Sequence, residues 1–298
     1  MIEKSFLKKI IKYPYKIATL NFNQLILVFS EAVKLFREET IVLELKKENP
    51  QDKVIVIGDL HGDLKSLMRL LEIITLENPK YIIFLGDIVD RGLYQLECLI
   101  LILALKIKDS NRYYLLKGNH ETLEVNQKYG FFQDFLNRFK DPKKFNHVTA
   151  IYNVLPYCAL INESILCLHG GIPEEFNVIN RLKGTKTSEI NLTYENTAKS
   201  LLQMMWNDPK PNQKGFTESF RGRDIKFFGE DVFIDFMREN KLDYLIRGHE
   251  RFPEAYKWFF NEQLLSIFSS ANYRGTLTPF PASYAIIRDK TVIPKIIS

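Results

Sequence analysis

The sequence contains few of the residues that build disulfide-rich or thiolate-metal proteins. Only three of its 298 residues are cysteine, Cys98, Cys158 and Cys167, and each lies within an apolar run. An odd number of cysteines without a Cys-x-x-Cys spacing argues against a disulfide framework and is typical of a reducing compartment. We therefore expect the cysteines to be buried, small apolar side chains, and we predict a cytoplasmic location.

Long hydrophobic runs are also missing. A membrane-spanning helix needs about 18 or more consecutive apolar residues, whereas the longest run here, Cys98 to Leu105, is bounded by Glu97 and Lys106. The basic residues 1–12 lack the long apolar stretch and small-residue cleavage site of a signal peptide. We predict no membrane span. A basic helix lying on a membrane surface is the alternative that residues 1–12 leave open.

A strong charge excess is absent as well. The net charge of +5 favours an anionic substrate, but the chain lacks the dense basic stripe of a nucleic-acid-binding domain, so we expect no nucleic acid partner. A length of 298 residues is near the upper limit for one hydrophobic core. We predict a single catalytic domain over residues 1–298, with a helical N-terminal cap at 1–48 and a catalytic core at 49–298.

A repeated pattern is present instead, in which an apolar run ends in glycine beside polar side chains. It occurs in residues 54–63, 81–92 and 113–121, and again in 164–171 and 244–250. Runs of β-branched and aromatic residues bounded by glycine are typical of buried strands. Because functional groups gather beyond the carboxyl ends of strands in an open sheet, we expect these segments to deliver Asp, His, Asn and Arg to one place.

Helical periodicity separates the first strands. Apolar residues recur at helical spacing in 64–76 and 95–106, and this alternation of strand and helix predicts a largely parallel sheet with right-handed crossovers. In the predicted cap, Asn23 is the expected N-cap of a helix over residues 24–39.

The later segments are less uniform. Residues 122–155 are expected to be helical with an aromatic face, whereas the polar residues 180–223 are expected to be rich in loops. Three apolar runs close together near the C-terminus, 264–268, 284–287 and 291–297, predict antiparallel strands in a second sheet.

Histidine is scarce, yet its placement is the most informative feature. Four of the five histidines lie beside a glycine just after an apolar run, and only His147 lacks this context. The candidate ligands at these strand ends are Asp59, His61, Asp87, Asn119, His169 and His249.

Imidazole and carboxylate without thiolate suit divalent zinc, iron or manganese. The set is too large for one tetrahedral zinc ion and is about right for two ions sharing one carboxylate. Such a pair, ~3.5–4 Å apart, can hold a bridging hydroxide and neutralise phosphoryl oxygens during in-line displacement.

The ordered motifs carry a family resemblance. Gly-Asp-Leu-His-Gly-Asp (58–63), Gly-Asp-Ile-Val-Asp-Arg-Gly (86–92), Gly-Asn-His-Glu (118–121), His-Gly-Gly (169–171) and Arg-Gly-His-Glu (247–250) occur in that order. The chain thus resembles the calcineurin-like metallophosphoesterase superfamily and, more narrowly, the phosphoprotein phosphatase family of type 1 and type 2A serine/threonine phosphatases. The likeness runs from about Ile41 to the C-terminus. It implies an α/β metallophosphoesterase fold, with two mixed β-sheets packed as a sandwich flanked by helices and a dimetal site at the strand C-terminal ends.

The resemblance also implies a role for each site residue. Asp59 and His61 would bind the first metal, Asp87 would bridge both, and Asn119, His169 and His249 would bind the second. His120 would be the general acid, oriented by Asp90. Arg91 and Arg221 would clamp the phosphate, and Tyr273 would lie at the rim. Two divalent ions are implied, with manganese expected and iron or zinc as alternatives.

These roles predict a metal-dependent serine/threonine phosphatase in which a dimetal-bridging hydroxide attacks phosphoprotein substrates directly. The alternatives are a dinucleoside polyphosphate hydrolase or another small-molecule phosphoesterase of the superfamily, and a binding protein on a decayed phosphatase fold. Asp90 and Arg91 could instead form a structural ion pair at a helix N-terminus, and Arg221, near Arg223 in an irregular segment, could be structural. Glu121 is expected to be a structural partner.

Three motifs depart from the familiar family pattern. Leu-Arg-Gly-Asn-His-Glu becomes Leu-Lys-Gly-Asn-His-Glu at 116–121. Arg-Ala-His-Gln becomes Arg-Gly-His-Glu at 247–250, which keeps the ligand histidine. The loop Ser-Ala-Pro-Asn-Tyr-Cys-Gly becomes Ser-Ser-Ala-Asn-Tyr-Arg-Gly at 269–275, so a proline is lost and Arg274 adds charge at the rim. These departures are typical of a divergent archaeal or bacterial member with an altered peptide preference.

Overall fold

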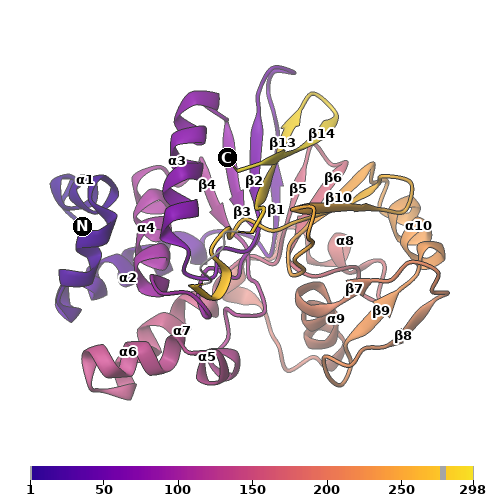
Figure 1. Ribbon diagram of the computed structural model, residues 1–298. Helices are drawn as coiled ribbons and strands as arrows, with labels where there is room; N and C mark the ends of the chain where they lie inside the picture. Colours follow the sequence, from indigo (N-terminus) through magenta and orange to yellow (C-terminus); the bar gives the residue numbers. More distant parts are fainter. Residues whose placement is uncertain (1, 276–279, 298) are drawn as a thin grey trace.

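Two β-sheets face each other at the centre of the protein, and helices cover both outer faces (Figure 1). This arrangement is seen in a computed structural model that describes residues 2–275 and 280–297. Both sheets contain parallel and antiparallel pairs. The α/β sandwich of two mixed sheets predicted from the sequence is therefore confirmed.

The first sheet has five strands in the order β14-β13-β2-β3-β4. Its strands are β2 (Val54–Ile57), β3 (Tyr81–Phe84), β4 (Tyr113–Leu115), β13 (Ser283–Arg288) and β14 (Thr291–Ile296). The strands β2, β3 and β4 are parallel, as the alternation with helices predicts, whereas β13 pairs antiparallel with both β2 and β14. All four residues of β2 are buried because this strand lies in the middle of the sheet and is covered on both faces.

The second sheet has six strands in the order β1-β5-β6-β10-β12-β11. These are β1 (Val42–Leu45), β5 (Cys158–Ile161), β6 (Ile165–Leu168), β10 (Tyr244–Arg247), β11 (Tyr256–Phe259) and β12 (Leu264–Ile267). The central strand β10 is parallel to both β6 and β12. Parallel pairing brings the carboxyl ends of β6 and β10 to the same edge.

Two sequence predictions about strands are corrected here. The C-terminal runs do not form a sheet of their own, since β12 joins the second sheet while β13 and β14 complete the first. Likewise, residues 1–48 are not helical throughout, because Val42–Leu45 is an edge strand that pairs with Cys158–Ile161. Both errors have one cause: strand partners distant in sequence leave no local signal.

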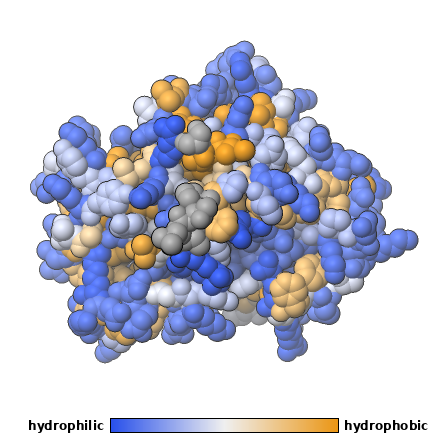
Figure 2. Space-filling model, viewed as in Figure 1, coloured by the Kyte–Doolittle hydropathy of each residue, from blue (hydrophilic) through white to orange (hydrophobic). Residues whose placement is uncertain are grey.

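Three apolar clusters fill the layers of the molecule. One lies between the two sheets and contains Val56 and Ile83 from the first and Ile246 from the second. Another packs the first sheet against the N-terminal helices, and the last packs the second sheet against the later helices. Hydrophilic residues cover most of the surface seen in Figure 2, with smaller hydrophobic patches between them.

The helices on the first sheet's outer side come from the N-terminal half of the chain (Figure 1). They are α1 (Lys4–Lys12), the 3₁₀ helix η1 (Pro14–Thr19), α2 (Phe22–Arg37), α3 (Leu64–Glu77), α4 (Gln95–Lys108), α5 (Leu123–Tyr129), α6 (Phe131–Phe139), η2 (Pro142–Phe145) and α7 (Asn146–Tyr152). Asn21, and not Asn23, caps α2, because its side chain accepts a hydrogen bond from the Gln24 backbone while the Gln24 side chain accepts one from Asn21. The aromatic face predicted for residues 122–155 packs as a cluster of Phe131, Phe135 and Phe145 rings.

The second sheet's outer side carries later elements. These are α8 (Val178–Leu182), η3 (Thr187–Glu189), α9 (Glu195–Trp206), α10 (Glu230–Glu239) and a small sheet of β7 (Asp208–Pro209), β9 (Lys226–Phe228) and β8 (Phe216–Glu218). Residues 180–223 are thus less loop-rich than predicted, since α9 buries Leu201 and Met204 on one face. The last 3₁₀ helix is η4 (Tyr273–Gly275). Within the described residues, no helix combines the length and apolar character needed to cross a membrane.

Candidate metal centre

The predicted site residues converge at one edge of the two sheets. Asp59 and His61 follow β2, Asp87 follows β3, and Asn119 and His120 follow β4. His169 follows β6 and His249 follows β10, so the second sheet supplies the remaining ligands predicted from the sequence. All of these side chains are buried, including that of His249, whose exposed area lies outside its imidazole side chain.

Close backbone packing explains why each run ends in glycine. A Cβ atom on Gly118 would lie 2.3 Å from Asp87 Oδ1, and one on Gly248 would lie 2.4 Å from Asp59 Oδ1. Several neighbouring residues adopt the left-handed backbone conformation, including His61 (φ 45°), Asp87 (φ 53°) and His249 (φ 70°). Such conformations are rare outside glycine and concentrate at functional sites, where packing holds them in place.

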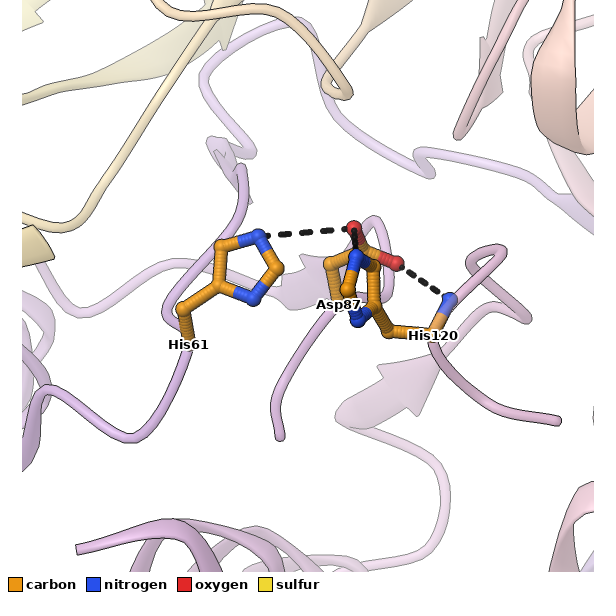
Figure 3. Close-up of side chains that lie close together, drawn as sticks. All are labelled: His61, Asp87 and His120. Atoms are coloured by element: carbon orange, nitrogen blue, oxygen red, sulfur yellow. Dashed lines mark hydrogen bonds and ion pairs between the residues drawn. The ribbon is translucent and has the colours of Figure 1, made fainter. Parts of the chain in front are cut away.

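The first group of ligand atoms surrounds Asp87 Oδ2. His61 Nδ1 lies 2.9 Å from the carbonyl oxygen of Val89, which fixes the proton on Nδ1 and leaves a lone pair on Nε2. That Nε2 faces Asp87 Oδ2 at 3.5 Å and Asp59 Oδ2 at 3.8 Å. Figure 3 shows the His61 ring nitrogen pointing at the Asp87 carboxylate. Lone pairs therefore converge where a cation would satisfy all three side chains.

The second group surrounds the other Asp87 oxygen. His169 Nδ1 lies 3.1 Å from the carbonyl oxygen of Leu85, so its Nε2 also presents a lone pair. This Nε2 is 3.3 Å from Asp87 Oδ1, 2.8 Å from Asn119 Oδ1 and 3.1 Å from His249 Nδ1. A ring nitrogen held by a backbone carbonyl, with the other nitrogen among oxygen ligands, is typical of metal-binding histidine. The donor sets fit two cations that share Asp87.

The pKa shifts of the site residues also favour the binding of cations. Burial raises the pKa of Asp59 to about 7 and the pKa of Asp87 well above its ordinary value. Burial also lowers the pKa values of His61, His169 and His249 well below the ordinary histidine value. Neutral imidazoles thus surround carboxylates whose ionised form is disfavoured, and a bound cation would stabilise that ionised form.

His120 and Asp90 form a hydrogen-bonded pair beside these ligands. His120 Nδ1 lies 2.7 Å from Asp90 Oδ2, and its Nε2 lies 3.8 Å from Asp87 Oδ2. Burial lowers the His120 pKa, while the hydrogen bond and charge of Asp90 act to raise it. Sequence analysis missed two groups that hold Asp90, the Asn126 side chain and the Phe131 backbone N–H, which donate to it over 2.8 and 2.9 Å. They lie beyond the motif in helices α5 and α6, where the sequence carries no sign of their role.

Glu121 supports the metal-binding loops from behind. Its carboxylate accepts hydrogen bonds from the backbone N–H groups of Asp87 (2.7 Å), Ile88 (3.0 Å) and Gly118 (2.9 Å). It therefore ties the loop after β3 to the loop after β4. The structural role expected for this residue is confirmed, and burial raises its pKa to about 7.

The two candidate phosphate clamps have different surroundings. The Arg91 guanidinium stacks on the Tyr129 ring at 3.8 Å. In the part of the chain that the structure describes, Asp90 pairs with His120 and does not form the alternative ion pair with Arg91. Arg221 is only partly exposed and donates through Nε to Asp208 Oδ2. Asp208 therefore orients Arg221.

A buried arginine that sequence analysis missed stands behind Arg221. Arg247 is fully buried and donates to Asp208 Oδ1 (2.8 Å), Glu250 Oε2 (2.8 Å) and the Gly170 carbonyl oxygen (2.6 Å). Arg247 directly precedes Gly248 and the candidate ligand His249, and this position was the sequence signal that could have identified it. Asp208 thus lies between a buried arginine and the candidate clamp Arg221.

Tyr273 packs against the site, as expected for a rim residue. Its ring centroid lies 5.2 Å from that of His61. The loop before it is held by Asp63, another residue that sequence analysis missed. The Asp63 carboxylate caps α3 and also accepts hydrogen bonds from the Ser270 hydroxyl (3.2 Å) and the Asn272 backbone (2.8 Å).

Residues 52–251 match the family model described as calcineurin-like phosphoesterase, and the chain therefore belongs to that family. It is 32% identical to serine/threonine-protein phosphatase BSL2 of Arabidopsis thaliana, over 93% of this chain and 28% of the relative. It is 30% identical to a catalytic subunit of protein phosphatase 2A from Dictyostelium discoideum, over 79% of this chain and 74% of the relative. The chain thus spans little more than a quarter of the plant protein.

A solved structure agrees with these relatives. A Saccharomyces cerevisiae serine/threonine phosphatase with similarity to human PP5 matches with a TM-score of 0.83 at 25% identity, covering 99% of this chain and 96% of the other. A Shewanella protein-tyrosine phosphatase shares the fold, with a TM-score of 0.62 at 15% identity over 89% of this chain and 82% of the other. The expected likeness to serine/threonine phosphatases is confirmed, whereas an archaeal or bacterial origin stays a prediction.

Proposed function

We propose that the protein is a metal-dependent serine/threonine phosphatase that hydrolyses phosphoproteins by direct in-line attack of water. The observation that carries this proposal is the convergence of lone pairs from His61, His169 and Asn119 on the two oxygens of Asp87. The serine/threonine phosphatases among its relatives support the same function and do not favour a dinucleoside polyphosphate hydrolase.

The metal ligands of this proposal fall into two sets. Asp59 and His61 would hold one ion, and Asn119, His169 and His249 the other, with Asp87 in both. Two divalent ions there would neutralise phosphoryl oxygens and lower the pKa of water enough for it to attack at neutral pH. We expect manganese, because nitrogen and oxygen donors without thiolate accept it readily, with iron or zinc as alternatives.

The proton needed by the leaving group comes from His120. A seryl or threonyl alkoxide is a poor leaving group, so a proton delivered as the P–O bond breaks lowers the barrier. The Asp90 carboxylate faces His120 Nδ1 at 2.7 Å, which holds the ring and favours its protonated form. Nε2, on the other side of the ring, is then free to donate toward the substrate.

The phosphate itself is oriented by arginine. Arg221 keeps its orientation through Asp208, and Arg91 keeps its orientation through stacking on Tyr129. Planar guanidinium groups can donate two parallel hydrogen bonds to phosphate oxygens, which holds the phosphorus in line for attack. Tyr273 closes the rim beside His61.

Two wider proposals follow from the same structure. Residues 1–298 act as a single catalytic unit, since Leu7 and Leu25 of the predicted cap share one apolar cluster with Leu99 of α4. A cytoplasmic location is supported by the three buried free cysteines, Cys98, Cys158 and Cys167, which suit a reducing compartment.

The test is phosphate release from a panel of substrates in the presence of manganese. The panel contains phosphoserine, phosphothreonine and phosphotyrosine peptides and a dinucleoside tetraphosphate. We expect hydrolysis of the phosphoserine and phosphothreonine peptides. Faster hydrolysis of the dinucleoside tetraphosphate than of any peptide would overturn the proposal.

The role of His120 is tested by His120→Asn. Turnover should fall roughly 10²–10⁴-fold, because a general acid contributes about that much, while the content of bound metal stays the same. His147→Asn is the matched control, because His147 packs on Phe22 away from the site. Equal turnover in the two variants would remove His120 as the acid.

A further inference from the structure

Two arginines lie beside Tyr273, and among the described residues neither has an acidic partner. The Arg251 guanidinium lies 5.9 Å from the Tyr273 ring centroid, and that of Arg274 lies 5.2 Å from it. Both residues are exposed, and within residues 2–275 and 280–297 neither forms an ion pair. The same Tyr273 ring contacts His61, so only this ring separates the two positive charges from the candidate metal ligand His61.

The surrounding segments hold these two cations in place. Arg251 stacks on the Phe280 ring at 3.9 Å, and the Phe280 backbone N–H donates to the Ala271 carbonyl oxygen over 2.7 Å. The Asp63 carboxylate accepts a hydrogen bond from the Asn272 backbone N–H, and Arg274, two residues later, adopts a left-handed conformation (φ 63°). Guanidinium groups positioned before binding lose less conformational entropy when they bind a ligand.

The nearby acidic groups do not neutralise this pair. Glu250, which directly precedes Arg251 in the sequence, is already bonded to Arg247. Glu254 is exposed and forms no ion pair with any residue that the structure describes. Stacking on aromatic rings also leaves the N–H edges of a guanidinium free for two parallel hydrogen bonds to a carboxylate or phosphate.

We propose that Arg251 and Arg274 bind a second anionic group of the substrate, so that the enzyme prefers peptides with an acidic or phosphorylated residue near the phosphoester. This inference rests on the proposed phosphatase function and specifies its substrate class. Arg91 and Arg221 hold the phosphate that is cleaved, whereas Arg251 and Arg274 recognise the anion that stays on the product. Arg274 stands where the familiar family members have cysteine, so we expect this preference in this chain and not in those members.

The test compares three phosphoserine peptides that differ only around the phosphoserine. One has neutral neighbours, one has aspartate neighbours, and one carries a second phosphoserine. For the wild-type enzyme, kcat/KM should be about tenfold higher for the two anionic peptides, as expected for two exposed ion pairs. Added sodium chloride should reduce that advantage, because exposed charges are screened.

The double variant Arg251→Gln/Arg274→Gln should bring the ratio between anionic and neutral peptides close to one, mainly through KM. Arg37→Gln is the matched control: it removes an exposed positive charge at the end of α2 and should keep the wild-type ratio. A wild-type ratio near one, or a ratio that survives in the double variant, overturns the inference. Wild-type hydrolysis of the neutral peptide is a separate result, and its absence would contradict the phosphatase function itself.

Discussion

The two halves of the metal centre balance their charges in different ways. The half after β2, β3 and β4 contains Asp59, Asp87 and Glu121, and its carboxylates accept hydrogen bonds mainly from backbone N–H groups. Among the described residues, no lysine or arginine pairs with any of these three acids. The half after β6 and β10 instead contains Arg247, which pairs with both Asp208 and Glu250. In the proposed enzyme a bound cation would balance the carboxylates of the first half, whereas the second half contains its own arginine.

This difference predicts the largest effect for Arg247→Met. Removing the buried cation leaves Glu250 without its arginine partner and Asp208 with Arg221 alone, which should lower the free energy of unfolding by about 3–5 kcal/mol. The matched change in the other half, Glu121→Gln, keeps one oxygen acceptor for the three backbone donors and should cost about 1–3 kcal/mol. Urea unfolding of both variants, without metal, gives the comparison. Equal losses would contradict the predicted difference between the two halves.

The second prediction concerns pH in the metal-free protein. The pKa values of Asp59 and Glu121 are raised by burial to about 7 in the fold, from ordinary values of 3.8 and 4.5. Between those values the folded state binds more protons than the unfolded chain, so the stability these groups contribute is lost as pH rises toward 7. Because one pKa unit corresponds to about 1.4 kcal/mol, each group should contribute a loss on the order of 3 kcal/mol across that range.

Manganese should change this pH dependence, because metal ligands bind in their deprotonated form. Thermal unfolding of the protein between pH 5 and 7.5, with chelator and with manganese, measures the effect. Asp59→Asn removes one of the two titrating groups and should flatten the chelator curve. The buried histidines, whose pKa values are lowered, act in the opposite direction, so the measure is the stability of Asp59→Asn relative to the wild type in chelator. That relative stability should increase as the pH rises, and a constant difference contradicts the idea.

The smallest effect is expected for Asp63→Asn. Asp63 follows β2 in the first half and holds the loop that precedes the rim residue Tyr273. An amide keeps one acceptor oxygen and loses the negative charge that receives bonds from Ser270 and Asn272. We expect a loss of about 1 kcal/mol in stability and a several-fold rise in KM with little change in kcat. Asp141→Asn serves as the control, since that carboxylate caps only its own short helix. If KM rises equally in both variants, Asp63 does not position the loop.

Local pattern explains why much of the site could be predicted from sequence. Each predicted ligand lies directly beside a glycine just after a strand, and the steric clash at Gly118 shows why another residue would not fit there. The role of Asn126 left no local signal, because it reaches Asp90 from helix α5. Arg247 lies within a recognised motif, but its partner Asp208 is distant in sequence, so the pairing could not be predicted. The C-terminal strands were assigned to the wrong sheet for the same reason, since alternation predicts a strand but not its partner.

The pairing of β13 with β2 also has a consequence for biosynthesis. Residues Tyr284–Ile287 align with Val54–Ile57, so the strand that carries Asp59 and His61 gains its neighbour only after more than two hundred intervening residues have been made. A ribosome adds roughly 5–20 residues per second, so one edge of β2 stays unpaired for about ten seconds or more during synthesis. Exposed strand edges invite pairing with other chains. The enzyme should therefore depend on chaperones during translation more than its finished structure suggests.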